Sequence, residues 1–241
     1  MTNLDDSIEK TTNIDENTIS HDQTTKEEST IITSHSESPS LIRVAKFFSA
    51  IFSPLLIPTY GIIIAFFLSY ISHVSRGGVR LIVTGVIFLF TCVTPAIYIW
   101  ILHSTGKLSD IGVNKQKERL KPYIFIIVLY SITIVYLSRI NAPNWIVGFM
   151  IGGGISAITS ALINMKWKIS AHGAAIGGLV ALVFSMWINR YVLFDFKPIV
   201  SFFILIAGIV GSSRILLQCH TLGQVLAGIA NGFFWVFFMT I

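Results

Sequence analysis

The chain has 241 residues, of which 53% are apolar and only 12% are charged, and its mean hydropathy is +0.74. These values exclude an ordinary soluble domain and indicate an integral membrane protein. The charge is divided unevenly. Residues 1–37 contain nine Asp or Glu and two Lys, whereas residues 38–241 contain fifteen Lys or Arg and three acidic residues. The formal net charge of +5 therefore combines an acidic segment with a basic one.

The first forty residues are rich in Ser, Thr, Asp, Glu and Asn and contain no apolar run. A segment of this composition cannot bury enough apolar surface to offset the entropy lost on folding. We therefore expect a disordered, polar and acidic tail at 1–40, followed by a transmembrane domain at 41–241.

Apolar runs predict the membrane-spanning helices, because a hydrocarbon core of about 30 Å requires about 20 apolar residues. Seven spans are predicted, at 47–71, 81–102, 122–140, 145–165, 171–187, 198–213 and 222–241. The first contains Pro54 and Pro58 and is expected to be kinked or broken, since proline removes a backbone N–H and clashes with the preceding turn. The expected fold is all-α, a polytopic transmembrane helical bundle of six to seven spans.

Three pairs of glycines spaced four residues apart predict close contacts between helices, because small residues let backbones approach each other in lipid. The pairs are Gly148/Gly152, Gly173/Gly177 and Gly228/Gly232. Tryptophans near the ends of the predicted spans are expected to be interfacial anchors. They are Trp145, Trp167 and Trp187. The two cysteines, Cys92 and Cys219, lie in or beside apolar runs and have no metal-ligand spacing, so we expect no structural disulfide and no metal site.

Polar side chains gather at the borders of the apolar spans, in residues 107–122, 166–172 and 214–220. An even number of predicted crossings separates each cluster from the next, so all three are expected on one membrane face, as a shared site requires. Ionisable groups at such borders are functional candidates. Arg214 can make paired hydrogen bonds to two phosphate oxygens, and the N–H groups that open the span at Ala171 favour an anion. Two histidines, His172 and His220, could serve as nucleophile and proton donor.

The spacing of these residues follows a recognisable order. The last cluster reads Ser213-Arg214-x5-His220-x3-Gln224, and the middle one reads Ile169-Ser170-Ala171-His172. This order resembles the type 2 phosphatidic acid phosphatase superfamily, whose motifs read Lys-x6-Arg-Pro, Pro-Ser-Gly-His and Ser-Arg-x5-His-x3-Asp. The first motif is degenerate here: Lys121 precedes Pro122 where the family has arginine, and Asn114 stands where it has lysine, although Lys115 and Arg119 are near enough to substitute.

The resemblance implies a six-helix catalytic core that hydrolyses a phosphomonoester or diphosphate on a lipid or prenyl substrate through a phosphohistidine, without a metal or other cofactor. It makes His220 the nucleophile, His172 the general acid and Gln224 the residue that supports the nucleophile. The predicted phosphate-binding residues are Arg214, Ser170, Lys121, Arg119, Lys115 and Ser213. The expected partners are the lipid phosphate or prenyl diphosphate and the surrounding membrane lipids, with no nucleic acid. We expect a multi-pass protein of a bacterial inner membrane.

Gln224 is the main departure from the family, which has an aspartate there. An amide oxygen can still hold the imidazole tautomer of His220, but it cannot stabilise a developing positive charge; the corresponding change in serine proteases lowers turnover about 10⁴-fold. We expect either slow activity or a carboxylate from Asp110 or Glu118 that supplies the missing charge. Other classes remain open, namely a catalytically weak or inactive protein that binds a phospholipid, a small transporter, and haem binding by the two histidines.

The membrane face of the site also stays open. Basic residues on the motif side outnumber those on the other side by ten to five, which favours a cytoplasmic site. However, several of the ten belong to the predicted site itself, and many family members face the periplasm or a lumen.

Overall fold

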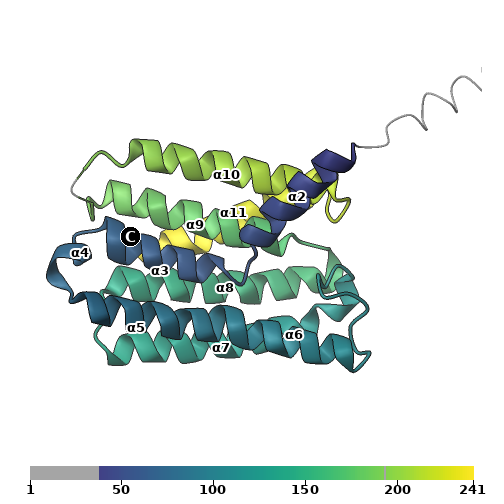
Figure 1. Ribbon diagram of the computed structural model, residues 1–241, viewed down its shortest axis with the longest axis horizontal. Coiled ribbons are helices and arrows are strands. Elements are labelled where there is room, and N and C mark those ends of the chain that lie inside the picture. The colour runs from purple at the N-terminus through teal and green to yellow at the C-terminus, as the bar shows by residue number, and fades with distance from the viewer. Residues whose placement is uncertain (1–37, 193) are drawn as a thin grey trace, which may run out of the picture. The chain divides into compact units, whose positions relative to one another are not determined.

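The computed structural model describes residues 38–192 and 194–241. Helices joined by short connections make up this part of the chain, and no strand occurs in it. The predicted tail at 1–40 lies outside the described residues except for its last three, so it stays a prediction. Residues 43–241 form one compact unit, and its long helices run side by side in Figure 1.

Six helices of the described residues are long and apolar enough to cross a membrane. The first, Gly77–Ser104, is continuous and consists of α5 (Gly77–Phe88), a π-helical segment (Leu89–Val93) and α6 (Thr94–Ser104). The others are α7 (Leu120–Arg139), α8 (Asn144–Lys166), α9 (Ala171–Ile188), α10 (Lys197–Leu216) and α11 (Leu222–Thr240). Their bounds agree with the last six predicted spans to within about one helical turn. The prediction of an all-α polytopic bundle is therefore confirmed.

The first predicted span is broken into separate helices. They are α2 (Pro39–Ile51), α3 (Ile57–Leu68) and the single turn α4 (Ile71–Val74). The break between α2 and α3 contains Pro54, which has no N–H to continue the helical hydrogen bonds. The twelve residues of α3 extend about 18 Å, well short of a hydrocarbon core of about 30 Å. The expected break is thus confirmed, and the other six predicted spans are the ones that form helices long enough to cross a membrane.

The core of the unit is a continuous apolar cluster to which most of the helices contribute. Helix α3 packs on α5, α8 and α9, and α8 also packs on α7 and α11. Side chains with no exposed surface fill the centre, among them Ile62, Ile87, Leu137, Met150 and Leu182. Because α3 is buried on these neighbours, a helix too short to span the membrane is held by packing within the bundle.

Glycines bring α9 and α11 into close contact, and this contact positions the site. A Cβ at Gly173 would lie 2.7 Å from the carbonyl oxygen of Val225, and one at Gly232 would collide with the carbonyl oxygen of Ala174. The small-residue prediction is confirmed, since any larger residue here would separate the two backbones. At the end of this contact, the backbone N–H of Ser170 donates to the carbonyl oxygen of Gln224 at 3.2 Å.

Trp145 does not lie where the sequence predicted it. It is only 6% exposed and stacks on Tyr191, with ring centroids 4.9 Å apart, so it packs inside the protein rather than anchoring at the lipid interface. Trp167 is 44% exposed, in agreement with an interfacial position. The position of Trp145 near a span end was therefore a poor guide, because the connection after α9 covers the ring.

Candidate active site

Three connections lie at one end of the bundle, at the right of Figure 1: those between α6 and α7, α8 and α9, and α10 and α11. They bring together Arg119, His172, Arg214 and His220, four of the residues that the sequence analysis selected. Arg119, Arg214 and His220 are only 6–7% exposed. The prediction that the polar clusters share one face is confirmed by hydrogen bonds that join residues about a hundred positions apart.

His220 lies two residues before α11 and is held in place by Gln224, the third residue of that helix. Thr221 and Gln224 form a capping box, in which the Gln224 side chain accepts the Thr221 N–H at 3.3 Å. The same Gln224 oxygen, Oε1, lies 3.0 Å from Nδ1 of His220 and, as an amide oxygen, accepts its proton. The ring is therefore in the tautomer with a lone pair on Nε2. Gln224 therefore caps the start of α11 and also orients His220, the predicted nucleophile.

Arg119 directs its guanidinium to His220 from the residue before α7. Its Nη2 lies 3.3 Å from Nε2 of His220, the nitrogen with the lone pair. Its Nη1 donates to the carbonyl oxygen of Ile169 at 2.8 Å, and its Nε donates to that of Val113 at 2.9 Å. Val113 has a φ of +49°, which is unfavourable for a β-branched residue. The loop holds this strained conformation where it presents a carbonyl to Arg119.

Arg214 lies in the last turn of α10 and is fixed by two neutral groups. Its Nη1 donates to the hydroxyl of Ser49 at 2.7 Å, and its Nη2 donates to Oδ1 of Asn114 at 3.3 Å. The Nε atom is buried and has no hydrogen-bond partner among the described residues. The arginine is therefore oriented, with an N–H group still available to an anion.

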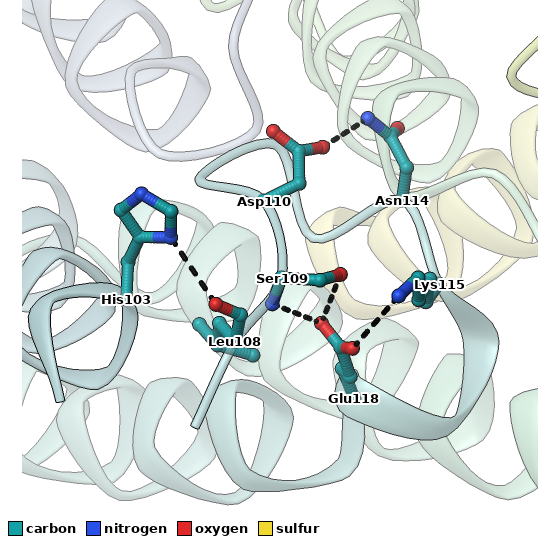
Figure 2. A network of polar contacts seen from close by, with 7 residues as sticks. All are labelled: His103, Leu108, Ser109, Asp110, Asn114, Lys115 and Glu118. Atoms are coloured by element: carbon teal, nitrogen blue, oxygen red, sulfur yellow. Dashed lines mark hydrogen bonds and ion pairs between the residues drawn. The ribbon is translucent and has the colours of Figure 1, made fainter. Parts of the chain in front are cut away.

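The loop that supplies Asn114 and Val113 is braced by its own polar contacts (Figure 2). The carboxylate of Glu118 accepts the N–H and the hydroxyl of Ser109, at 2.9 and 3.0 Å, and lies 3.8 Å from Nζ of Lys115. The Ser109 N–H is the main cause that lowers the pKa of Glu118. The Asn114 amide donates to the carboxylate of Asp110. These contacts hold the loop in the shape that carries Asn114 to Arg214.

These loop contacts account for both acidic residues near the site, Glu118 and Asp110. Glu118 is bound to Ser109 and Lys115, and Asp110 is bound to Asn114, so neither carboxylate is among the hydrogen-bond partners of His220 in the described part of the chain. Asp110 instead reaches Arg214 through Asn114. The hypothesis that one of the two replaces the missing aspartate finds no support in these contacts.

The other predicted site residues differ in position. Ser170 is fully buried, and its hydroxyl accepts the Gly173 N–H as the N-cap of α9. The Ser213 hydroxyl donates to the carbonyl of Ile209 within α10. Lys115 pairs with Glu118, and Lys121 is exposed at the start of α7. Their roles in phosphate binding stay predictions, and the first two hydroxyls already have local structural roles.

The electrostatics of the site are those of cations without acidic partners. Within residues 38–192 and 194–241, neither Arg119 nor Arg214 forms an ion pair. Burial lowers the pKa of Arg119, and the charge of Arg214 adds a smaller effect. Burial is also the main cause that lowers the pKa of His220 to about 4, and Arg119 is the second. Buried cations without counter-charge are costly, so the arrangement favours a bound anion.

A pocket of about 180 Å³ opens between these groups and is lined by Arg119, His172, Arg214 and His220 on its polar side. Ile99, Ile111 and Ile126 are among the apolar residues of its other walls. A second pocket of about 100 Å³ extends into the bundle and shares lining residues with the first, namely Pro54, Leu55, Tyr123, Ile126 and Ala171. A polar group at the membrane border and an apolar chain in the bundle interior would therefore fit side by side.

Residues 164–241 match the model of the PAP2 superfamily. The match covers 78 of the 241 residues and supports membership of the PAP2 superfamily. No match to the chain was found among curated proteins or among solved structures. The PAP2 match contains His172, Arg214, His220 and Gln224, whereas Arg119 lies outside it. Together with the six apolar helices, it makes the chain a multi-pass, phosphatase-type membrane protein, as the sequence analysis predicted.

Sequence reasoning missed the roles of three residues in this candidate site. Ser49 contacts both Arg214 and His172, Asn114 accepts from Arg214, and the Nζ of Lys168 donates to the carbonyl of Cys219 at 2.7 Å, next to His220. Burial lowers the pKa of Lys168, and the charge of Arg119 lowers it further. Within the described ranges, no group of three or more His, Cys, Asp or Glu is placed to hold a metal ion; metal independence stays a prediction.

Proposed function

We propose that the protein hydrolyses a phosphomonoester or diphosphate on a lipid or prenyl substrate, through a phosphohistidine on His220. The observation that carries this proposal is the state of the His220 ring. Gln224 holds the proton on Nδ1, and Nε2 keeps its lone pair beside a guanidinium in a pocket lined by two arginines that form no ion pair within the described part of the chain. Because the pKa of His220 is lowered to about 4, the ring is neutral and nucleophilic at neutral pH.

The proposed reaction has two steps. In the first, the Nε2 lone pair of His220 attacks phosphorus, the bond from phosphorus to the leaving oxygen breaks, and His172, which enters this step protonated on both ring nitrogens, gives that oxygen a proton. In the second, water attacks phosphorus, His172 takes one proton from the water, and the N–P bond breaks to release phosphate. Arg119 and Arg214 bind the phosphate oxygens throughout, and the Arg119 contact with Nε2 is exchanged for one with phosphate.

A lipid substrate is supported by the apolar pocket that adjoins the polar one. Apart from the five residues it shares with the polar pocket, its walls include Tyr130, Phe149 and Gly178 from three different helices. An acyl or prenyl chain could enter it from the membrane while the phosphate stays at the border. The proposed location is a bacterial inner membrane, and the reaction needs no metal ion because the cationic side chains supply the charge.

A second function, phospholipid binding with little or no turnover, is favoured by Gln224 alone. The imidazole becomes positively charged when the phosphohistidine forms, and a neutral amide offers it little stabilisation. Slow turnover and tight binding of phosphate would then occur together.

Phosphate release by the detergent-purified protein tests both proposals. A panel of phosphatidic acid, phosphatidylglycerophosphate, prenyl diphosphate and lipid A would be assayed with and without a chelator, beside a His220→Ala variant. We expect chelator-resistant release that the variant lacks, and a ³²P-labelled protein trapped by rapid acid-free quenching in the wild type alone. Binding of labelled lipid without release from any substrate, in folded protein, would establish the binding function instead.

A further inference from the structure

Ser49 connects helix α2 to the site through both of its oxygen atoms. The residue is 8% exposed and lies on the inward face of α2, one turn after the buried Ala45. Its hydroxyl accepts from Nη1 of Arg214 at 2.7 Å and lies 3.3 Å from Nε2 of His172. Its carbonyl oxygen lies 3.1 Å from the same Nε2. One residue of α2 thus contacts both a predicted phosphate-binding group and the predicted general acid.

The carbonyl contact fixes the tautomer of His172. A carbonyl oxygen can only accept, so Nε2 carries the hydrogen and Nδ1 carries the lone pair of the neutral ring. The Ser49 carbonyl is free for this bond because it lies in the last turn of α2; the following N–H groups of Phe52 and Ser53 bond to Phe48 and Ala50. A helix C-terminus also carries partial negative charge, which complements an imidazole that must hold a proton in a site with two arginines.

The two histidines are therefore arranged in mirror fashion. In His220, a neutral oxygen of Gln224 holds Nδ1–H and leaves Nε2 to react. In His172, a neutral oxygen of Ser49 holds Nε2–H and leaves Nδ1 to accept and donate the proton of the reaction. Nδ1 of His172 has no hydrogen-bond partner in the described part of the chain, so nothing competes for that proton.

The hydroxyl contact orients Arg214. With Nη1 held by Ser49 and Nη2 by Asn114, the guanidinium plane is fixed from two sides, and the buried Nε–H remains for a ligand. Removing the hydroxyl leaves a long side chain with one weak neutral contact at 3.3 Å. A cation that must be reordered on each binding event binds phosphate less well.

We infer that Ser49 is a positioning residue of the site, whose hydroxyl orients Arg214 for phosphate and whose carbonyl makes Nδ1 the working nitrogen of His172. The inference rests on the proposed phosphatase function for its kinetic consequences, whereas its consequences for phosphate binding do not require turnover. Ser49 also lies outside the matched residues 164–241, so the site depends on a helix that the family match does not cover.

The test compares Ser49→Thr with Ser49→Val, which have nearly the same shape and differ in the hydroxyl. The dissociation constant of inorganic phosphate would be measured by calorimetry in detergent, and the KM for the best lipid substrate beside it. We expect Ser49→Val to weaken phosphate binding roughly tenfold, as loss of a hydrogen bond to a charged group does, and Ser49→Thr to stay within about twofold of the wild type. Ser138→Ala, which removes an exposed hydroxyl on α7, is the matched control for the loss of a hydroxyl elsewhere.

The carbonyl arm is tested by ¹⁵N NMR of protein labelled at histidine, with His172 assigned by a His172→Gln variant. We expect the neutral ring of His172 in the Nε2–H tautomer; the Nδ1–H tautomer would overturn the assignment of the working nitrogen. Equal phosphate affinity of Ser49→Val and Ser49→Thr in folded protein would overturn the role of the hydroxyl. If no lipid is hydrolysed but phosphate binds and Ser49→Val weakens it, the proposed hydrolysis fails and the inference about Arg214 stands.

Discussion

The two ends of the helix bundle bury opposite kinds of side chain. At the site end, two arginines and a histidine are 6–7% exposed, and none of them is paired with a carboxylate among the described residues. At the other end, Trp145 stacks on Tyr191, which also lies 6.4 Å from Tyr70 between ring centroids. Stacked rings need no ligand, although the Nε1 of Trp145 has no hydrogen-bond partner among the described residues, whereas buried cations are stabilised by a bound anion. The aromatic end therefore contributes mainly to stability, whereas the site end favours binding of an anionic ligand.

The largest effect on activity is expected from a substitution at the site end of the bundle. Arg214→Gln should lower kcat/KM about 10²–10³-fold, because it removes a preorganised donor to the transferring phosphoryl group. Its thermal stability should not fall, since the variant no longer buries an unpaired charge. The matched control is Arg139→Gln, an exposed arginine at the opposite end of α7. Steady-state phosphate release and thermal unfolding would be measured together; an equal loss of activity in both variants would contradict the prediction.

At the other end of the bundle, a substitution is expected to lower stability and leave substrate binding unchanged. Trp145→Ala should lower the free energy of unfolding by about 3 kcal/mol, because it removes a buried ring and its stacking contact with Tyr191. The KM below the unfolding transition should be unchanged. Trp100→Ala, which removes a ring that is 60% exposed on α6, should cost much less. Thermal unfolding in detergent compares the three proteins, and a raised KM in Trp145→Ala would show that the two ends are coupled.

A smaller effect is expected from a change of charge beside His220. Gln224→Glu keeps the shape and the acceptor oxygen but places a negative charge about 3 Å from Nδ1 of His220. A neutral His220 is required, so kcat/KM of the wild type should hold at mildly acidic pH and fall as the pH drops through its lowered pKa of about 4. An added carboxylate raises the pKa of a histidine, so this fall should move to higher pH, with turnover at pH 7 rising about tenfold.

The control for this charge is Thr221→Ser, which leaves the capping box and the amide in place. Its pH profile of kcat/KM should follow the wild type. An unchanged profile in Gln224→Glu would mean that residue 224 acts only on the start of α11.

The smallest effect concerns the apolar pocket. Ala157→Phe should fill part of the space beside Tyr130 and lower kcat/KM for long-chain lipid phosphates about three- to tenfold, with short-chain substrates little affected. Ala230→Phe, on an exposed position of α11, is the matched control. Activity against a series of chain lengths separates the cases, and an equal loss on all lengths would argue against a chain in this pocket.

The sequence predicted those features that depend on local composition or fixed spacing. Six apolar runs of sufficient length became six helices, and the spacing of Arg214, His220 and His172 identified residues that converge. Prolines at 54 and 58 predicted the break before α3, but the burial of so short a helix depends on its neighbours and has no local signal.

Ser49 and Asn114 could not be predicted for a similar reason. Ser49 is one hydroxyl in an apolar helix, more than a hundred residues from its partners, and no motif marks it. Asn114 was read as the degraded position of a lysine, whereas it holds Arg214 through its amide oxygen. Lys168 was counted only for charge. These contacts arise from the meeting of separate helices, and only the folded chain places them together.

The break between α2 and α3 also places irregular backbone against the interior space. Pro54 and Leu55 line both the polar and the apolar pocket, so the same two residues would touch the phosphate-bearing end and the chain of a bound lipid. Non-helical backbone at membrane depth is tolerated where it lines a cavity. Head-group affinity and chain-length preference therefore depend on the same two residues. A substitution at Leu55 should alter both properties together rather than either one alone.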